Sequence, residues 1–240
     1  MKHSKFIAIV LSVVLVFSSC NMNNTTKGGL IGGGGGAALG ALVGSLIGGG
    51  IGGGTAIGAA IGGAVGTGAG VLIGKKMDKV KQQAEAVQNA QVQTITDANG
   101  LEAVKVTFDS GILFTTGSAT LSSTAKFSLN QFANNVLKAN PDLEVAILGF
   151  TDNAGWKNST AEQSAQKNLN LSQQRADAVK NYLFSQGVLT KQVKTSTGLG
   201  EQNPVADNST DAGKAQNRRV EVYLYASQAM IEAAKKEAQN

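Results

Sequence analysis

"LSQQRADAVKNYLFSQGV", residues 171–188, decides how the C-terminal part of the chain folds. Its apolar side chains recur at helical spacing, which predicts a helix with one buried face. Gly187 marks the end of that helix, since glycine is the residue most often found just beyond a helix. A helix with a single apolar face needs a sheet or another helix to pack against. The side chains expected on that face are Leu171, Ala178, Val179, Tyr182 and Leu183.

Strand patterns lie on both sides of this helix. The uninterrupted apolar run "LEVAILGF", residues 143–150, indicates a buried strand, and "RRVEVYLYA", residues 218–226, alternates as a half-buried strand does. "VKTSTGLG", residues 193–200, predicts a short strand and a turn. Upstream, two alternating stretches flank "DANG", which predicts a hairpin with strands near residues 91–96 and 101–108.

A second helix is expected between residues 121 and 136, where apolar residues again follow helical spacing until Asn140-Pro141 stops it. The polar, helix-prone residues 77–91 are expected to form a connector, and residues 227–240 a charged surface helix. Helices therefore alternate with strands after an opening hairpin. The predicted fold class is α+β, a sandwich made of a mixed β-sheet with helices on one face.

The first 19 residues have the anatomy of a secretory signal. A basic start precedes a short apolar run, residues 6–17, and two serines stand directly before Cys20. Small residues before a lone cysteine resemble a bacterial lipoprotein box, which implies removal of residues 1–19, lipidation of Cys20 and a spacer over residues 20–27. Asn21 after the cysteine, by the same resemblance, favours the outer membrane. The alternatives are an ordinary cleaved signal, or an uncleaved anchor with an incidental cysteine.

Residues 28–76 form a glycine-rich segment. Between Gly28 and Gly74 it carries no charge, and its glycines recur in steps of four. Repeated G-x-x-x-G lets membrane helices approach closely. We therefore expect a membrane-associated glycine-zipper hairpin with helices near residues 30–48 and 54–74, each about 28–31 Å long, close to the thickness of a hydrocarbon core. The pattern also allows copies of the chain to associate. The alternatives are a disordered glycine spacer and a pore made by several copies.

Composition excludes several classes of function. The formal net charge of the 240 residues is +5, and the charges are too few and too scattered to favour a nucleic acid as partner. The single histidine, His3, and the single cysteine, Cys20, lie near the N-terminus. The rest of the chain therefore offers no Ser-His-Asp triad, no Cys-His pair and no Cys/His zinc site. We expect no enzyme, no metal and no cofactor.

The C-terminal part resembles a known family. The motifs "GSATLS", "GFTDNAG", "NLNLSQQRADAVKNYL", "GLGEQNPVADN" and "NRRVEV" occur in this order between about residues 105 and 226. Each motif is weak alone, but the ordered set resembles the OmpA-like C-terminal domain, a peptidoglycan-binding module. The resemblance implies a peptidoglycan-binding domain over residues 92–226. Residues 28–76 similarly resemble the glycine-zipper segments of bacterial envelope lipoproteins.

Asp152 and Arg175 form the expected centre of the binding site. Asp152 follows a buried strand, in a turn of the kind that commonly carries function, and Arg175 lies near the start of the next helix. A carboxylate and a guanidinium facing one groove match a zwitterionic ligand. The resemblance implies that Asp152 contacts the ammonium and Arg175 the carboxylate of diaminopimelate in the peptide stem. It also implies further pocket residues: Thr151, Asn168 and Leu171, which shape the pocket, and Asn217 and Arg219, which border it. The alternative is that Asp152 caps a turn and Arg175 pairs with a surface acid.

The stretch "WKNSTAEQSAQK", residues 156–167, departs from the family pattern. It adds about eight residues to the loop that is expected between Asp152 and Leu171. The only tryptophan, Trp156, lies in this stretch. Its side chain either covers the groove and stacks on sugar or packs as a small local core, and we favour packing.

These observations predict a protein that binds peptidoglycan without catalysis and tethers the outer membrane to the cell wall. The chain would be lipid-anchored in the outer membrane, with its soluble domain facing the periplasm. One alternative is a glycoside hydrolase that uses Asp142, Glu144 and Asp152, since paired carboxylates cleave glycosides. We do not favour it, because Asp152 lies beyond the strand that the other two precede. The other alternative is a glycine-zipper pore or envelope-stress protein that a wall-binding domain positions.

Overall fold

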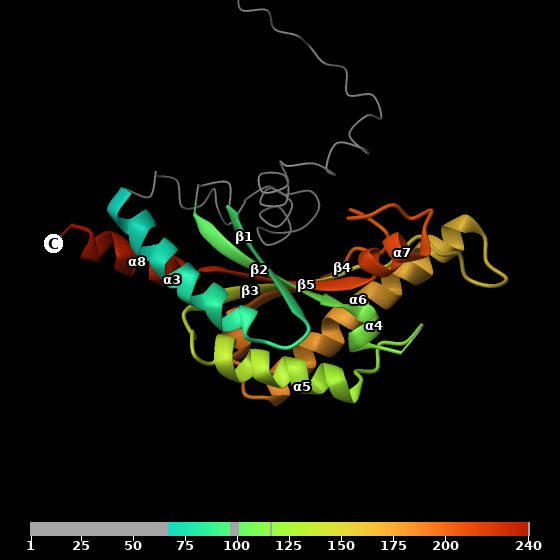
Figure 1. Ribbon diagram of the computed structural model, residues 1–240, viewed down its shortest axis with the longest axis horizontal. Coiled ribbons are helices and arrows are strands. Elements are labelled where there is room, and N and C mark those ends of the chain that lie inside the picture. The colour runs from blue at the N-terminus through green and yellow to red at the C-terminus, as the bar shows by residue number, and fades with distance from the viewer. Residues whose placement is uncertain (1–66, 97–100, 116, 240) are drawn as a thin grey trace, which may run out of the picture.

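The computed structural model describes residues 67–239, except 97–100 and 116 (Figure 1). A long first helix leads into a sheet of five strands with further helices. The elements are α3 (Thr67–Glu85), β1 (Ala90–Thr96), β2 (Glu102–Asp109), α4 (Ser110–Leu113), α5 (Ser123–Phe132), the π-helical turn η2 (Ala133–Leu137), β3 (Leu143–Gly149), α6 (Ala161–Ser185), the 3-10 turn η3 (Thr190–Gln192), β4 (Val193–Gly198), α7 (Asp211–Asn217), β5 (Arg219–Ala226) and α8 (Gln228–Glu237).

The sheet has the strand order β1-β2-β5-β3-β4. Neighbouring strands are antiparallel except β3 and β4, which run parallel. Parallel neighbours need a crossover connection, and α6 supplies it between these two strands. The last strand, β5, lies at the centre between β2 and β3. The predicted hairpin, the buried strand and the mixed sheet are confirmed.

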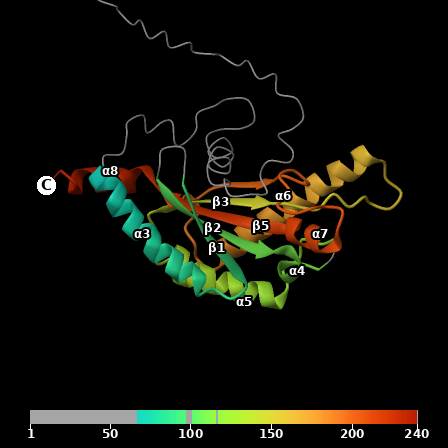
Figure 2. The ribbon, with the colours of Figure 1, turned by 45° about the horizontal axis from the view of Figure 1, so that its top comes forward.

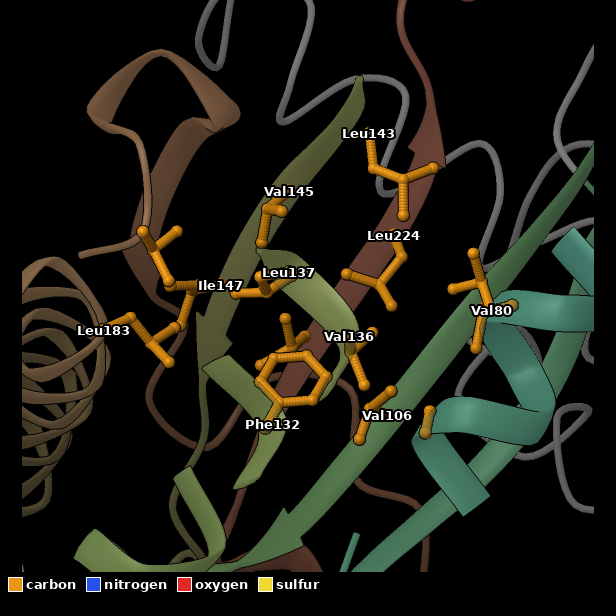
Figure 3. Packing of buried hydrophobic residues seen from close by; sticks show 14 of the residues in the cluster. Val80, Val106, Phe132, Val136, Leu137, Leu143, Val145, Ile147, Leu183 and Leu224 are labelled. Carbon is orange, nitrogen blue, oxygen red and sulfur yellow. The ribbon is translucent and has the colours of Figure 1, made fainter. Parts of the chain in front are cut away.

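The main core lies between the sheet and its helices. Alternate residues of the central strands point into it, among them Val145 and Ile147 of β3. Phe132 of α5 packs edge-to-face on Phe108 of β2, with ring centroids 5.7 Å apart. Figure 3 shows Phe132 and Leu183 of the helices gathered with these strand side chains, and Figure 2 shows α5 on the underside of the sheet. The predicted α+β fold, with its helices on one face, is confirmed.

The first helix differs from what the sequence predicts. Residues 77–91 were expected to be a connector, but α3 continues from Thr67 to Glu85 and buries an apolar stripe in the main core. The stripe has one apolar side chain every three or four residues, and most of the residues after Gly74 that lie between them are polar or charged. The composition of the segment is therefore polar although one face of the helix is apolar. The residues of the stripe are Ala69, Ile73, Met77, Val80 and Ala84. The end of the expected second zipper helix, residues 67–74, therefore packs inside this domain.

The rest of the expected zipper hairpin, together with the signal and Cys20, lies outside the described residues. Among the helices of the described part, none combines the length and apolarity that a membrane crossing requires. The C-terminal segment is also more than a charged surface helix, because α8 packs on α3 and buries Met230 and Ile231.

The crossover helix α6 begins ten residues earlier than the predicted 171. Its first turn carries a capping box: the Thr160 hydroxyl accepts from the Gln163 backbone, and the Gln163 side chain accepts from the Thr160 backbone. Most of the stretch 156–167 is therefore helix rather than loop. The signal was present as T-x-x-Q, but the residues after it are polar and give no apolar stripe until Leu171.

The smaller helical elements were not predicted. Both α4 and α7 are too short to show periodicity. The expected helix 121–136 begins at Ser123, because Leu121 forms a β-bridge with Phe114 and Ser122 is the N-cap. It closes in the π-helical turn η2.

Two glycines bring α6 unusually close to the sheet. A Cβ atom on Gly149 would lie 2.2 Å from the Ser172 carbonyl oxygen, and one on Gly198 would lie 2.1 Å from the Gln173 backbone nitrogen. No side chain fits at such distances, so glycine is required at the ends of β3 and β4. The close contact sets the middle of α6 directly against the turn that follows β3. This turn and this part of α6 form the candidate site.

Candidate functional site

A cavity of about 850 Å³ opens beside the carboxyl end of β3. Its walls come from α4 and the loop after it, from the turn after β3, from α6 and from the residue before β5. The lining residues are Ser110, Gly111, Phe114, Thr115, Gly117, Ser122, Thr151, Asp152, Ala154, Gly155, Trp156, Lys157, Asn168, Leu171, Arg175 and Arg218. Five of the seven residues predicted for the ligand site meet here: Thr151, Asp152, Asn168, Leu171 and Arg175.

Asp152 accepts two hydrogen bonds at the edge of the cavity. The Ala154 backbone N–H donates to its Oδ1 atom at 3.1 Å. Arg218 donates from Nη1 to the Oδ2 atom at 2.5 Å. The Asp152 side chain is only 10% exposed, whereas the Arg218 side chain is 39% exposed, so the arginine end of this ion pair still contacts water. A hydrogen bond from the Thr151 N–H to the Gly200 carbonyl fixes the backbone at the start of the turn.

Arg175 is a buried cation on the opposite wall. Its Nε atom donates to the Ser118 carbonyl at 3.0 Å, and its guanidinium lies 5.2 Å from the centre of the Phe114 ring. Burial is the largest cause that lowers the pKa of Arg175, and the charge of Arg218 lowers it further, while Asp152 raises it. The cavity lining thus holds three cationic side chains, Lys157, Arg175 and Arg218, and one anionic side chain, Asp152. The excess positive charge favours a ligand that brings a carboxylate or another anion.

Asn168 holds the turn after β3 in place. From α6 its side-chain amide donates to the Ala154 carbonyl at 3.2 Å and to the Asp152 carbonyl at 3.4 Å. Its Oδ1 atom accepts from the indole N–H of Trp156 at 2.7 Å. The Trp156 backbone N–H donates to the Ser164 hydroxyl. Hydrogen bonds to two residues of α6 therefore hold Trp156, and Trp156 also lines the cavity. The two predicted roles of Trp156, local packing and covering the groove, do not exclude each other.

Two buried hydroxyls of the cavity wall have no hydrogen-bond partner within the described part of the chain. They belong to Ser110 and Thr151. Buried hydroxyls are nearly always hydrogen-bonded in folded proteins. Both residues belong to the cavity lining.

Asn217 and Arg219 do not line this cavity, although the sequence places them at its border. Asn217 is fully buried and ties down a loop: its Oδ1 atom accepts from the N–H groups of Val205 and Ala206. Arg219 points to the other face of the sheet, where its guanidinium lies 3.8 Å from the centre of the Phe150 ring and bonds Glu221. Both residues stabilise the structure next to the cavity and do not line it.

Arg218 is the cavity residue that the sequence reasoning missed. It directly precedes β5, and alternation along an extended chain sends adjacent side chains to opposite sides. The two arginines of "NRRVEV" therefore cannot both face one groove. The pattern alone does not say which of them does. Among the described residues, no cluster of three or more potential metal-ligating side chains occurs.

Both parts of the chain are similar to known protein families. The OmpA family model matches residues 113–218, and the YMGG-like Gly-zipper model matches residues 1–78. The chain is 44% identical over 119 residues to the "Probable lipoprotein YiaD" of Escherichia coli K12, covering 50% of this chain and 47% of YiaD. It is 45% identical over 96 residues to the peptidoglycan-binding protein ArfA of Mycobacterium tuberculosis, covering 40% of this chain and 26% of ArfA. The chain thus spans less than half of either relative.

A solved structure shows the same fold. The crystal structure of a MotB-like protein from Desulfovibrio vulgaris superposes with a TM-score of 0.55 at 23% identity, over 66% of this chain and 96% of that one. The resemblance seen in the five motifs is confirmed: the chain carries a domain of the OmpA family, and a YMGG-like Gly-zipper segment precedes it.

Proposed function

We propose that the chain binds peptidoglycan, without catalysis, in the cavity between Asp152 and Arg175. The observation that carries the proposal is the charge arrangement: the Asp152 carboxylate, paired with Arg218, and the buried guanidinium of Arg175 line one cavity of about 850 Å³. The end of a diaminopimelate side chain bears one ammonium and one carboxylate. Asp152 suits the ammonium, and Arg175 together with Arg218 suits the carboxylate. The similarity to the peptidoglycan-binding protein ArfA supports peptidoglycan as the ligand.

The proposed role is a tether between the outer membrane and the wall. A lipid on Cys20 would hold the chain to the membrane, and the cavity would hold the wall. Single contacts of this kind are weak and reversible, but many copies acting on one sacculus hold two layers together firmly. The similarity to a probable lipoprotein supports the anchor. The soluble domain would then face the periplasm.

Sedimentation with purified diaminopimelate-type sacculi tests the binding. We expect the mature chain to sediment with sacculi, and Asp152→Asn and Arg175→Gln each to lose at least tenfold in affinity. Two matched variants, Asp78→Asn and Lys191→Ala, remove an exposed charge of the same sign elsewhere and should bind as the wild type does. A wild-type chain that stays in the supernatant would overturn the proposed function.

Competition identifies the recognised group. A muropeptide that contains diaminopimelate should displace the chain from sacculi, whereas the corresponding muropeptide with lysine, whose side chain ends in an ammonium without a carboxylate, should not. Equal competition by the two muropeptides would rule out the roles given to Arg175 and Arg218. For the anchor, incorporation of labelled palmitate should occur in the wild type and vanish in Cys20→Ser.

A further inference from the structure

A second cavity, of about 360 Å³, lies on the face of the sheet opposite to the main core. It is bounded by β1, β2 and β5 and by α7 with the loop before it. We define the lysine pocket by six of its lining residues: Gln91, Gln93, Lys105, Gln216, Arg219 and Glu221. Along β2 and β5 its charged side chains alternate with core residues such as Val106 and Val220, which places them on the second face. No residue lines both this pocket and the cavity beside Asp152.

The carboxylate of Glu221 lies at the floor of the lysine pocket and is satisfied within the protein. Arg219 donates from Nε to the Glu221 Oε1 atom at 2.8 Å, and the Tyr223 hydroxyl donates to Oε2 at 2.6 Å. The side chains of Arg219 and Glu221 are both almost fully buried. Glu221 therefore has one strong donor on each oxygen.

Lys105 is the floor residue that lacks such partners. Its Nζ atom lies 3.8 Å from the Glu221 Oε1 atom, beyond hydrogen-bond distance, and its side chain is 8% exposed. Among the described residues, no acceptor forms a hydrogen bond with this ammonium. An ammonium has three donors, and a buried charge without hydrogen bonds is costly. The pocket therefore lacks an acceptor at Lys105.

The charges at the floor favour an anionic acceptor. Two cations, Lys105 and Arg219, meet the single anion Glu221 there. The other carboxylate of the lining, Asp109, lies four residues along β2 from Lys105, about 13 Å between Cα atoms. Its Oδ1 atom accepts from the Gly111 N–H, and no ion pair joins it to Lys105 in the described part of the chain. One positive charge at the floor thus remains uncompensated.

Glutamine side chains surround the entrance of the lysine pocket. Gln91 and Gln93 project from β1, and Gln216 projects from α7; all three are exposed. Gln93 is directly opposite Lys105 in the β1–β2 pairing, so its amide can reach a group that is bound at the ammonium. A glutamine amide both donates and accepts hydrogen bonds, as a peptide group does. The floor therefore suits a carboxylate, and the entrance suits the peptide groups attached to it.

We propose that the lysine pocket binds the free C-terminal carboxylate of a short peptide. Lys105 donates to the carboxylate, and Gln93 and Gln216 pair with the neighbouring peptide group. A volume of about 360 Å³ lies near the lower end for small-molecule sites, which suits a ligand of dipeptide size. An inorganic anion would satisfy Lys105 but would leave the three glutamines unused.

NMR titration of the ¹⁵N-labelled mature chain, with Cys20→Ser, tests the site. The probe is the dipeptide L-alanyl-L-alanine, and its C-terminal amide is the matched compound without a carboxylate. We expect the dipeptide to shift the signals of Gln93, Lys105 and Gln216, and the amide to bind at least tenfold more weakly, because a hydrogen bond to a charged group is lost. Equal binding of the two compounds would overturn the proposal.

Two variants and one internal reporter locate the dipeptide. Lys105→Met should lose at least tenfold in affinity for it, whereas Lys191→Met, which removes an exposed ammonium elsewhere, should bind as the wild type does. The indole signal of Trp156 reports the cavity beside Asp152 and should not move. A dipeptide that shifts Trp156 and leaves the three pocket signals unchanged would occupy that other cavity and contradict the proposal.

The proposal stays testable if Lys105→Met does not fold. The comparison of the dipeptide with its amide needs no variant, and Gln93→Ala changes only an exposed side chain at the entrance. This variant should weaken binding by about threefold, the loss of one neutral hydrogen bond. D-alanyl-D-alanine then identifies the source of the carboxylate: tighter binding than that of the L,L form assigns it to a wall peptide, and weaker binding to an ordinary peptide end. Sacculus binding through the Asp152 cavity is measured separately, so either proposal can fail alone.

Discussion

Arg218 donates from Nη1 to the Asp152 Oδ2 atom at 2.5 Å, while Arg175 stands on the opposite wall of the same cavity. The two arginines are close enough for the charge of Arg218 to lower the pKa of Arg175. Like charges at a shared site repel unless an anion lies between them. The carboxylate of a ligand would relieve this repulsion, and the ammonium would share Asp152 with Arg218.

The first prediction concerns Arg218. Arg218→Gln should weaken binding to sacculi about tenfold, which corresponds to about 1.4 kcal/mol, because one of two guanidinium groups facing the ligand carboxylate is lost. Sedimentation at two salt concentrations measures the loss, and the variant should show the weaker salt dependence. Stronger binding by Arg218→Gln would instead mean that Arg218 only occupies Asp152 and competes with the ligand.

Trp156 should report ligand binding directly. It is the only tryptophan of the chain and lines the cavity, so its fluorescence reflects this site alone. We expect the emission of the wild type to shift when a diaminopimelate-containing muropeptide is added, with no shift in Asp152→Asn. A separate variant, Asn168→Ala, should move the emission to the red without any ligand, because the indole N–H loses its acceptor. Unchanged emission of the wild type on addition of the muropeptide would place the ligand away from Trp156.

The close approach of α6 to β3 predicts a large loss of stability for Gly149→Ala. The added methyl would lie 2.2 Å from the Ser172 carbonyl oxygen, and neither backbone can move without disturbing the sheet. We expect a loss of about 3 kcal/mol in the free energy of unfolding, at the upper end for overpacking. Gly70→Ala is the matched control: on α3 the new methyl meets no described atom within 4 Å, and the helix should gain up to about 1 kcal/mol. Urea unfolding of the two variants measures both changes in the free energy of unfolding. Equal stabilities of the two variants would contradict the steric clash predicted at Gly149.

Asp177 predicts a pH dependence of stability. Burial alone would raise the pKa of its carboxyl, but hydrogen bonds from Gln173, Lys180 and Ser196, with the charge of Lys180, bring the pKa below its ordinary value of 3.8. Because the folded state has the lower pKa, the carboxylate contributes stability above pH 3.8 and loses it as the pH falls through the folded value.

Asp177→Asn should therefore cost about 1 kcal/mol at pH 7, at the low end for hydrogen bonds to a charged group, since about a third of the side chain is exposed. The difference from the wild type should shrink as the pH drops below 3.8. Urea unfolding at pH 7 and at pH 3 checks this. A difference of the same size at both values would mean that the charge of Asp177 contributes nothing.

The sequence predicted those elements whose burial pattern is local. The run 143–150 and the alternating 218–226 became β3 and β5 almost to the residue, because continuous or alternating apolar side chains depend only on the strand itself. It missed the role of α3, whose single apolar stripe is interrupted along the sequence by lysines and glutamines. It also missed the early start of α6, where the capping box precedes two polar turns.

The sequence predicted those site residues that belong to the family motifs and lie close together in the chain. Asp152, Arg175 and Asn168 come together because β3, its following turn and α6 are consecutive in the chain, and their spacing is set locally. Arg218 and the unpartnered hydroxyls of Ser110 and Thr151 come from distant segments or from backbone geometry, and no sequence period reveals them. Asn217 and Arg219 were predicted to border the cavity because they belong to a motif of the family, but neither of them lines it.

The packing of α3 gives the domain a mechanical property. In Figure 1, α3 and α8 lie at one end of the long axis, and the elements of the cavity lie toward the other. In the proposed tether, a force between the membrane and the wall would act on α3 first, at Thr67. It would separate the buried apolar face of α3 from the core one helical turn at a time. The 19 residues of α3 measure about 28 Å as a helix and about 65 Å when extended. In the proposed tether, the domain would therefore lengthen under load by about 35 Å while the sheet and the proposed wall-binding cavity stay intact.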